Sequence, residues 1–313
     1  MKVTRLTYPN INISERQDGK SIALGYFDGV HTGHQHVINK AIEIAQEKGL
    51  KSAVMTFDPH PVTVLKNVEL TDYLITTLDE KITLFEQLGV DEVIVSTFNE
   101  PFSKLKPEQF VNLFLLQQNV QHVVAGFDYS FGHKGAGKIQ NMDNYSEGQL
   151  PFTIIDQVSY DEEKISSTKI REMIRSGNIK ACQKWLGRPY QVENEVIKGH
   201  QRGREIGYPT ANLLIPAGKV IPKTGVYIVT ATVNGKQYEG VANLGFNPTF
   251  SDDLAQPILE VNLFDFNENI YGEMMKVDFH QYIREEEKFD SVQQLIEQMK
   301  EDEAISRKYF NES

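Results

Sequence analysis

Short apolar runs alternate with segments of helical periodicity between Ser21 and about Thr153. The apolar runs predict buried strands over residues 21–27, 51–57, 92–97 and 122–127. The intervening segments predict three helices. The first has apolar positions at Val37, Ile38, Ala41, Ile42 and Ala45 and ends at Gly49. The second has Ile82, Phe85 and Leu88, and the third begins after Pro107 and has Phe110, Leu113 and Phe114. This alternation is typical of an open α/β sheet, whose ligands bind beyond the carboxyl ends of the strands.

The pattern changes after a helical stretch that covers about residues 167–186. Two β-branched runs, GVYIVTATV and KQYEGVANL, flank Asn234-Gly235, a pair that strongly indicates a β-hairpin. The segments ILEVNLFDF and EMMKVDFHQYI add strand-like pattern, and Val292, Leu295, Ile296 and Met299 recur at helical spacing. The second half is therefore predicted to be a small antiparallel β domain, a barrel, with a terminal helix packed on it.

The length and charge of the chain refine this division. The 313 residues suggest two domains, which we place at 1–183 and 184–313 with a short join between Ser176 and Pro189. The net charge of −11 gives no general attraction to nucleic acid or to an anionic membrane. A phosphate ligand would have to be held by local geometry.

Cysteine use and the amino terminus bear on the compartment. Cys182 is the only cysteine, so an intramolecular disulfide framework and Cys-Cys metal ribbons are excluded. The amino-terminal segment has no apolar core typical of a signal peptide, and no apolar run approaches the roughly 18 residues of a membrane span. We expect a soluble cytoplasmic protein, a monomer or weak homo-oligomer without nucleic-acid or membrane partners.

The first predicted strand leads directly into GYFDGVHTGHQHVI, where a helix begins. His31 and His34 flank Gly33, so backbone N–H groups, the helix dipole and two imidazoles meet at a position suited to phosphate. Two alternatives remain open. The histidines, with His36, could bind a metal, although their spacing matches no standard zinc site, or they could simply cap the helix.

A second phosphate candidate is ISSTKIREMI. Ser166, Ser167 and Thr168 lie at the expected start of a helix, and Arg171 lies one turn further on. Three hydroxyls and a guanidinium suit a triphosphate, whereas the alternative is an ordinary N-cap.

The stretch GHKGAGK has most of the spacing of a P-loop. Ile139 occupies the position of the Mg²⁺-binding Ser or Thr, and no helical pattern opens at Lys138. We therefore interpret this stretch as a Gly-rich loop and not as a nucleotide cradle.

Four motifs in the first half, GYFDGVHTGHQ, TFDPHP, GFDYSFG and ISSTKIR, resemble in this order the adenylyltransferase half of the bacterial bifunctional riboflavin kinase/FAD synthetase family. That family belongs to the wider HxGH nucleotidyltransferases, which implies a Rossmann-like domain. The resemblance implies that ATP is bound by Gly25, Phe27, Asp28, His31, Gly33, His34, Ser166, Ser167, Thr168 and Arg171.

The same resemblance implies that FMN is bound by Phe57, Pro59, His60, Pro61, Asp128 and Phe131. The FMN phosphate would attack the α-phosphorus of ATP, and pyrophosphate would leave. His31, His34 and Arg171 would stabilise the departing charge, with Mg²⁺ bridging the phosphates. The stretch 133–138 departs from family members that carry Arg there.

The β half offers a second candidate site. Pro209-Thr210-Ala211-Asn212 presents a hydroxyl and an amide on one face of an extended strand, and these are neutral oxygen ligands of the kind that Mg²⁺ accepts. Gly199, Gly203 and Gly207 would let a backbone flap close on phosphates. The alternative is an ordinary turn.

Glu260 starts a largely apolar strand, so its carboxylate is either a solvated edge charge or a base in a cleft. GHQRGREIGYPTANL, GVANLGFNPTF and LEVNLFDFNENIYG resemble the riboflavin kinase module of the same family, which implies that Glu260 accepts the proton of the ribityl hydroxyl. Asn262 stands where many members have His.

The sequence thus predicts an enzyme that converts riboflavin to FMN and FMN to FAD with ATP and Mg²⁺. Three alternatives remain: adenylyl transfer alone beside a weakened kinase, a flavin-binding regulatory protein, and a nucleotidyltransferase that acts on another phosphorylated metabolite.

Overall fold

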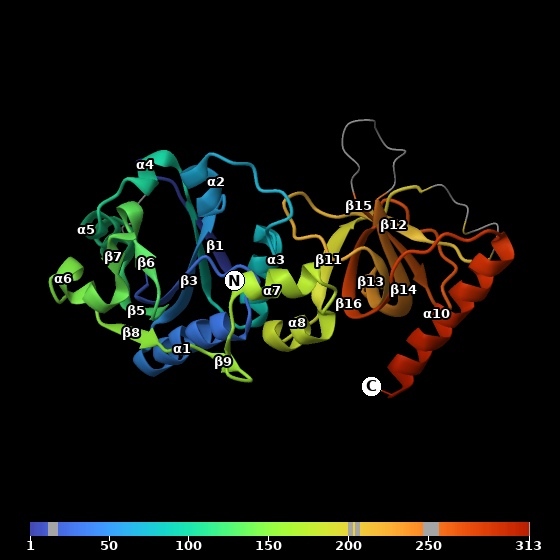
Figure 1. The fold of residues 1–313 in the computed structure, drawn as a ribbon. Coiled ribbons are helices and arrows are strands. Elements are labelled where there is room, and N and C mark those ends of the chain that lie inside the picture. Colours follow the sequence, from blue (N-terminus) through green and yellow to red (C-terminus); the bar gives the residue numbers. More distant parts are fainter. Residues whose placement is uncertain (12–17, 200–202, 204–206, 247–256, 313) are drawn as a thin grey trace. The chain divides into compact units, whose positions relative to one another are not determined.

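The computed structural model describes residues 1–11, 18–199, 203, 207–246 and 257–312 (Figure 1). The chain forms two compact units. The first contains Met1–Leu70 and Leu74–Ser167, and the second contains Thr71–Tyr73 and Thr168–Ser313. Within the described residues, no helix is both long enough and apolar enough to cross a membrane.

The first unit is built on a six-stranded parallel sheet with the order β1-β4-β3-β2-β5-β8. Its strands are β1 (Lys2–Leu6), β2 (Lys20–Leu24), β3 (Lys51–Asp58), β4 (Glu92–Thr97), β5 (Val120–Gly126) and β8 (Phe152–Ile155). Both faces of the central strands are covered, which explains why their sequences are apolar runs without alternation. The predicted α/β architecture is confirmed.

The helices of the first unit supply two separate cores. On one face α1 (Thr32–Lys48) and α3 (Leu78–Gln87) contribute Ile38 and Phe85 to a cluster with Ala23 and Val54. On the other face Phe102, Phe110 and Phe114 pack against Ile22 and Leu24. The smaller helices are α2 (Pro61–Lys66), α4 (Glu100–Ser103), α5 (Pro107–Phe110) and α6 (Met142–Ser146).

Two local predictions need correction. The strand predicted over 21–27 ends at Leu24, because the chain turns sharply there and Phe27 has a φ of 59°. The helix predicted after Pro107 is α-helical only to Phe110 and continues as a π-helical segment η1 (Val111–Leu115) and a 3-10 segment η2 (Leu116–Gln118). Apolar spacing alone does not distinguish these helix types.

The Gly-rich stretch 132–138 contains no nucleotide-binding helix start. It forms a short 3-10 turn, η3 (His133–Gly135), and the strand β7 (Gly137–Lys138), which pairs with β6 (Ser130–Phe131). A further 3-10 turn, η4 (Ile139–Asn141), leads into α6. The hairpin β9 (Ser159–Tyr160) and β10 (Glu163–Lys164) precedes the ISST motif.

The second unit contains a nearly closed antiparallel barrel with the strand order β11-β16-β13-β14-β15-β12. Its strands are β11 (Tyr190–Glu195), β12 (Ala211–Leu214), β13 (Gly225–Val233), β14 (Lys236–Phe246), β15 (Pro257–Leu263) and β16 (Met274–Arg284). The two ends of the sheet meet, because the Asn194 amide donates to the Leu214 carbonyl at 3.0 Å and Ile197 bridges to Asn212. The predicted barrel and the Asn234-Gly235 hairpin are confirmed.

The stretch predicted as helical over 167–186 is two helices, α7 (Ser167–Arg175) and α8 (Ile179–Leu186). Gly177 separates them with a φ of +78°, a conformation that suits glycine. Cys182 is fully buried in α8, and burial raises the pKa of its thiol to about 12, so the thiol is a packing group.

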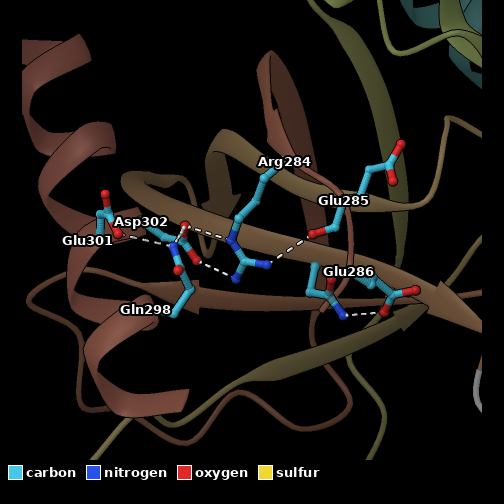
Figure 2. Close-up of polar contacts among 7 residues, drawn as sticks. Arg284, Glu285, Glu286, Gln298, Glu301 and Asp302 are labelled. Carbon is cyan, nitrogen blue, oxygen red and sulfur yellow. Dashed lines mark hydrogen bonds and ion pairs between the residues drawn. The ribbon is translucent and has the colours of Figure 1, made fainter. Parts of the chain in front are cut away.

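The terminal helix α10 (Val292–Glu312) is fixed to the barrel by a buried ion pair (Figure 2). Arg284, the last residue of β16, donates from Nε and Nη2 to the two carboxylate oxygens of Asp302 at 3.0 and 2.8 Å. Gln298 donates to the same carboxylate at 3.3 Å. The predicted terminal helix is therefore confirmed, and this ion pair is one of its contacts with the barrel strands.

Candidate functional site

Three of the motif segments in the first unit lie together at the carboxyl edge of the sheet. Residues 25–31 follow β2, residues 59–61 follow β3, and residues 127–131 follow β5. In the strand order, β2 lies between β3 and β5, so the chain changes direction at this point. Open α/β sheets bind ligands in the crevice at such a switch point.

The loop between β2 and α1 has an unusual backbone. Phe27, Gly29 and Val30 have φ values of 59°, 84° and 41°. Positive φ at residues other than glycine costs about 1–3 kcal/mol each and persists only where the surroundings enforce it. Gly25 is required locally, because a Cβ there would approach the Phe27 ring to 2.7 Å. The loop is thus held in one shape, as a preorganised ligand site requires.

His31 and His34 lie at the amino terminus of α1. Nδ1 of His31 accepts a hydrogen bond from the backbone N–H of His34 at 3.2 Å, and the two rings stack with centroids 3.5 Å apart. A Cβ on Gly33 would meet the His31 ring at 3.2 Å, so glycine lets the imidazole lie close to the backbone. His31 therefore caps the helix. Its second ring nitrogen is the group suited to a ligand.

The metal alternative for these histidines finds no support in geometry. His36 bonds to the Thr32 carbonyl of its own helix at 2.7 Å. Within the described ranges, no group of three or more His, Cys, Asp or Glu side chains is arranged to hold a metal ion.

Asp28 and Phe27, both predicted to bind ATP, have structural contacts. The buried carboxylate of Asp28 accepts hydrogen bonds from the backbone N–H groups of Ile75 and Thr76 at 3.0 and 3.1 Å. The side chain of Phe27 packs in the core against Phe85. These contacts fix the loop shape, and direct contact of either side chain with ATP stays a prediction.

The ISST motif reaches the same loop through Ser167, the first residue of α7. Its hydroxyl donates to the Asp28 carbonyl at 2.9 Å. Thr168 and Arg171 group with the second unit, where Arg171 Nε donates to the Tyr73 carbonyl at 2.7 Å and the guanidinium lies 4.0 Å from the Tyr73 ring centroid. The predicted ATP contacts of Ser166, Thr168 and Arg171 stay predictions.

The predicted flavin residues divide into buried and accessible groups. Phe57 and Phe131 are 8% and 5% exposed and belong to the aromatic core. His60 caps α2, accepts from the Val62 N–H at 3.0 Å, and meets the Tyr26 ring edge-on at 4.2 Å. Pro59 and Pro61 flank His60, and the exposed Asp128 carboxylate pairs with Lys164 at 3.0 Å. Contact of these residues with FMN stays a prediction.

The second unit aligns three polar residues across three strands. Glu260 was predicted to start a strand but lies in the middle of β15, which begins at Pro257. In the barrel register it lies directly opposite Asn212 of β12 on one side and Asn243 of β14 on the other. Directly opposed residues place their side chains on the same face of a sheet. Glu260 is therefore flanked by two amides, and Asn243 also donates to the Glu286 carboxylate at 3.0 Å.

The second unit also contains a cavity of about 510 Å³, a volume within the range of small-molecule sites. Its lining includes Ala211 and Val261, the chain neighbours of Asn212 and Glu260, but not the three residues of the row. Its wall contains the predicted Pro209 and Thr210 and also the segment 266–271. Asn262 anchors the wall, since its amide donates to the Pro209 carbonyl at 2.8 Å.

The glycines of the predicted flap have different surroundings. A Cβ at Gly199 would meet the Asn212 side chain at 2.5 Å, and one at Gly203 would collide with the Tyr208 carbonyl. Gly207 has a φ of +87°. Residues 200–202 and 204–206 of the flap, and the NPTF part of GVANLGFNPTF, lie outside the described residues.

Two parts of this site lie within the quoted motifs, but the sequence assigned them no role. Asn243 becomes a candidate only through the register of β14 and β15, although the Asn234-Gly235 turn fixes the register of β13 with β14. The segment 266–271 gave a weak signal, a polar stretch closing on Tyr271-Gly272 after an apolar strand.

Comparisons with known proteins match both units. A family model described as FAD synthetase matches residues 13–169, and one described as riboflavin kinase matches residues 186–310. Bifunctional riboflavin kinase/FMN adenylyltransferases from Bacillus subtilis and Listeria monocytogenes are 44% and 45% identical to this chain, over 99% of it and 99% and 98% of their own lengths. A crystal structure described as a macrolide-efflux protein from Streptococcus pneumoniae has a TM-score of 0.88 and 35% identity, and the match covers 98% of this chain and 99% of that chain.

Proposed function

Because the chain belongs to the bifunctional riboflavin kinase/FMN adenylyltransferase family, it is a transferase of flavin nucleotide synthesis, and we propose how its residues divide the two reactions. The domain 184–313 phosphorylates riboflavin to FMN with ATP. The domain 1–183 adenylylates FMN to FAD and releases pyrophosphate. The observation that carries the proposal is that two separate ranges match the two activities and that each contains its own cluster of polar residues.

Adenylyl transfer needs no general base in this chain. The nucleophile is the FMN phosphate, which already carries about −1.5 to −2 charges at pH 7, like other phosphate monoesters. The task of the protein is to place it in line with the α-phosphorus of ATP and to stabilise charge on the departing pyrophosphate. His31 and His34, at the positive end of α1, and Arg171 would supply the donors, and the segment around His60 and Asp128 would receive the flavin.

Phosphorylation of riboflavin presents the opposite problem, because its nucleophile is a neutral ribityl hydroxyl. Glu260 is the carboxylate in the polar row, and we assign it to accept that proton as the hydroxyl attacks the γ-phosphorus of ATP. Asn212 and Asn243 lie directly across from it and would hold it in place. The cavity with Pro209, Thr210 and residues 266–271 in its wall would receive ATP, and Gly199, Gly203 and Gly207 would let the backbone approach its phosphates.

The donor set of the kinase site suits Mg²⁺. The Thr210 hydroxyl and the Asn212 amide oxygen are hard, neutral ligands, and Mg²⁺ takes such ligands together with phosphates and water. Bound there, the ion would neutralise charge on the ATP phosphates. In the adenylyltransferase site the same role would fall to an ion carried by ATP.

Product chromatography tests the assignment and separates it from its alternatives. The purified chain is incubated with riboflavin, ATP and Mg²⁺, and in a parallel reaction with FMN in place of riboflavin. We expect FMN and FAD from the first reaction and FAD from the second. FAD from supplied FMN only would indicate a kinase module that does not turn over, and flavin binding without products would indicate a regulatory protein.

Other aspects of the proposal follow from composition. We place the enzyme in the cytoplasm, where its single buried thiol stays reduced. Its partners are the small molecules ATP, riboflavin and FMN, and it acts as a monomer or weak homo-oligomer.

A further inference from the structure

A buried lysine lies directly behind the loop that presents His31. Lys81 of α3 is 1% exposed, and its ammonium donates to the Tyr26 carbonyl at 3.1 Å and to the Thr56 hydroxyl at 3.0 Å. The same nitrogen lies 3.8 Å from the centroid of the Tyr26 ring. Burying a cation away from water is unfavourable unless it is well partnered, so its position calls for an explanation.

One partner of Lys81, Tyr26, lies at the start of the strained loop. Tyr26 precedes Phe27, the first of the residues with positive φ, and its carbonyl also accepts the Thr56 hydroxyl at 2.8 Å. The Tyr26 carbonyl therefore accepts two hydrogen bonds, one from the Lys81 ammonium and one from the Thr56 hydroxyl. Further along, the loop is held by the Asp28 carboxylate and by the Gly29 N–H, which donates to Thr76 at 2.9 Å.

Tyr26 also connects the loop with the flavin segment. Its ring contacts the Lys81 ammonium and also meets the His60 ring edge-on, with the two ring centroids 4.2 Å apart. Thr56, the other partner of Lys81, lies on β3 immediately before Phe57 and Asp58. One ammonium group thus contacts both the loop that follows β2 and the strand β3, the two elements that lead into the predicted substrate segments.

We propose that Lys81 is a positioning residue for adenylyl transfer, which sets the placement of the His31 loop relative to the His60 segment through Tyr26 and Thr56. This proposal rests on the proposed function of the first unit. The buried ammonium would hold the strained backbone of the loop and would also place a positive charge near a site that receives phosphates.

The test compares two buried lysines of the first unit, Lys81 on α3 and Lys20 on β2. Lys81→Met removes the ammonium behind the carboxyl edge. Lys20→Met is the control, because Lys20 is 3% exposed and lies at the opposite, amino-terminal edge of the strands, where it donates to the Gln118 carbonyl at 2.9 Å and pairs with Glu92 at 3.7 Å. Rates of FAD formation from FMN and ATP, and of FMN formation from riboflavin, are measured at a temperature where both variants are folded.

We expect Lys81→Met to lower kcat for FAD formation by about 100-fold, as displaced reacting groups do, with riboflavin phosphorylation within twofold of wild type. Lys20→Met should retain FAD formation within about threefold. Equal losses in the two variants would overturn the positioning role. If wild type itself forms no FAD, the proposed function fails instead, so the two failures are distinguishable.

A pH series keeps the proposal testable if Lys81→Met does not fold. Burial lowers the pKa of Lys81 to about 8, opposed by the carboxylates of Asp28 and Asp58, the charged groups that face it. FAD formation by wild type should therefore decline above pH 8. Lys81→Arg keeps its charge and should not show this decline, whereas the same alkaline decline in both proteins would overturn the proposal.

Discussion

The hydroxyl of Ser167 donates a hydrogen bond to the carbonyl of Asp28 at 2.9 Å, although the two residues lie 139 positions apart. This contact joins the ISST motif to the histidine loop, the two segments that sequence analysis assigned to one nucleotide. The loop itself is strained, so an added hydrogen bond at its centre helps to keep its shape.

Ser167→Ala should therefore impair adenylyl transfer selectively. The lost hydrogen bond is worth about 0.5–1.5 kcal/mol, and we expect the KM for ATP to rise by about 3- to 10-fold in FAD formation. Riboflavin phosphorylation should stay unchanged. The control is Ser176→Ala. Ser176 lies just beyond the end of α7, and its hydroxyl donates to the Met173 carbonyl. Equal effects of the two substitutions would show that the link to Asp28 has no role.

Lys81 should make stability depend on pH in a direction opposite to activity. Its pKa is about 8 in the folded protein against an ordinary value of 10.5, so between these values the unfolded chain holds a proton that the folded chain has released. Stability conferred through this group must then increase as the pH rises from 8 to 10.5. Urea midpoints measured across this range should rise for wild type relative to Lys81→Met, and parallel curves would contradict the assignment.

The two Arg–Asp pairs of the second unit should differ in their contribution to stability. Asp302 is 3% exposed, so Asp302→Asn leaves the Arg284 guanidinium without its counter-charge in a buried place (Figure 2). Breaking a fully buried pair costs about 3–5 kcal/mol, and the cost here should be lower because the Arg284 side chain is 18% exposed. Asp265 forms a similar bidentate pair with Arg307, but the Asp265 side chain is 80% exposed and its charge is screened by water. Asp265→Asn should therefore cost much less stability.

Thermal unfolding of the full chain measures both variants. Asp302→Asn should lower the unfolding temperature of the second unit clearly more than Asp265→Asn does. Similar shifts would mean that burial of the Arg284 pair contributes nothing to holding α10.

The sequence predicts the parts of the fold that depend on local pattern. Continuous apolar runs identified β3, β4 and β5, and the Asn234-Gly235 turn identified the β13–β14 hairpin. The strand β1 was missed because KVTRL is short and alternates, as an edge strand does, and its partner β4 lies about 90 residues away. The break at Gly177 was also missed, although Ser176-Gly177-Asn178 is turn chemistry.

Candidate site residues that lie close together in the sequence could be predicted, and those brought together by the fold could not. His31, Gly33 and His34 form a helix start that can be recognised from spacing alone. The opposition of Glu260 and Asn243, and the buried Lys81 beneath Tyr26, depend on strand register and helix packing. Lys81 lies one turn before Phe85 on the buried face of α3, but lysine is a residue type that does not predict burial.

The most direct test of the whole account is the product pattern of Glu260→Gln, which keeps the size of the side chain and removes the base. Given riboflavin and ATP, it should form FMN at a rate about 10²- to 10⁴-fold below wild type, the contribution typical of a general base. Given FMN and ATP, it should form FAD at the wild-type rate, as should the control Glu239→Gln, an exposed position on neighbouring β14. If Glu260→Gln lowers both rates together, or neither, the assignment of the two reactions to two separate sites is wrong.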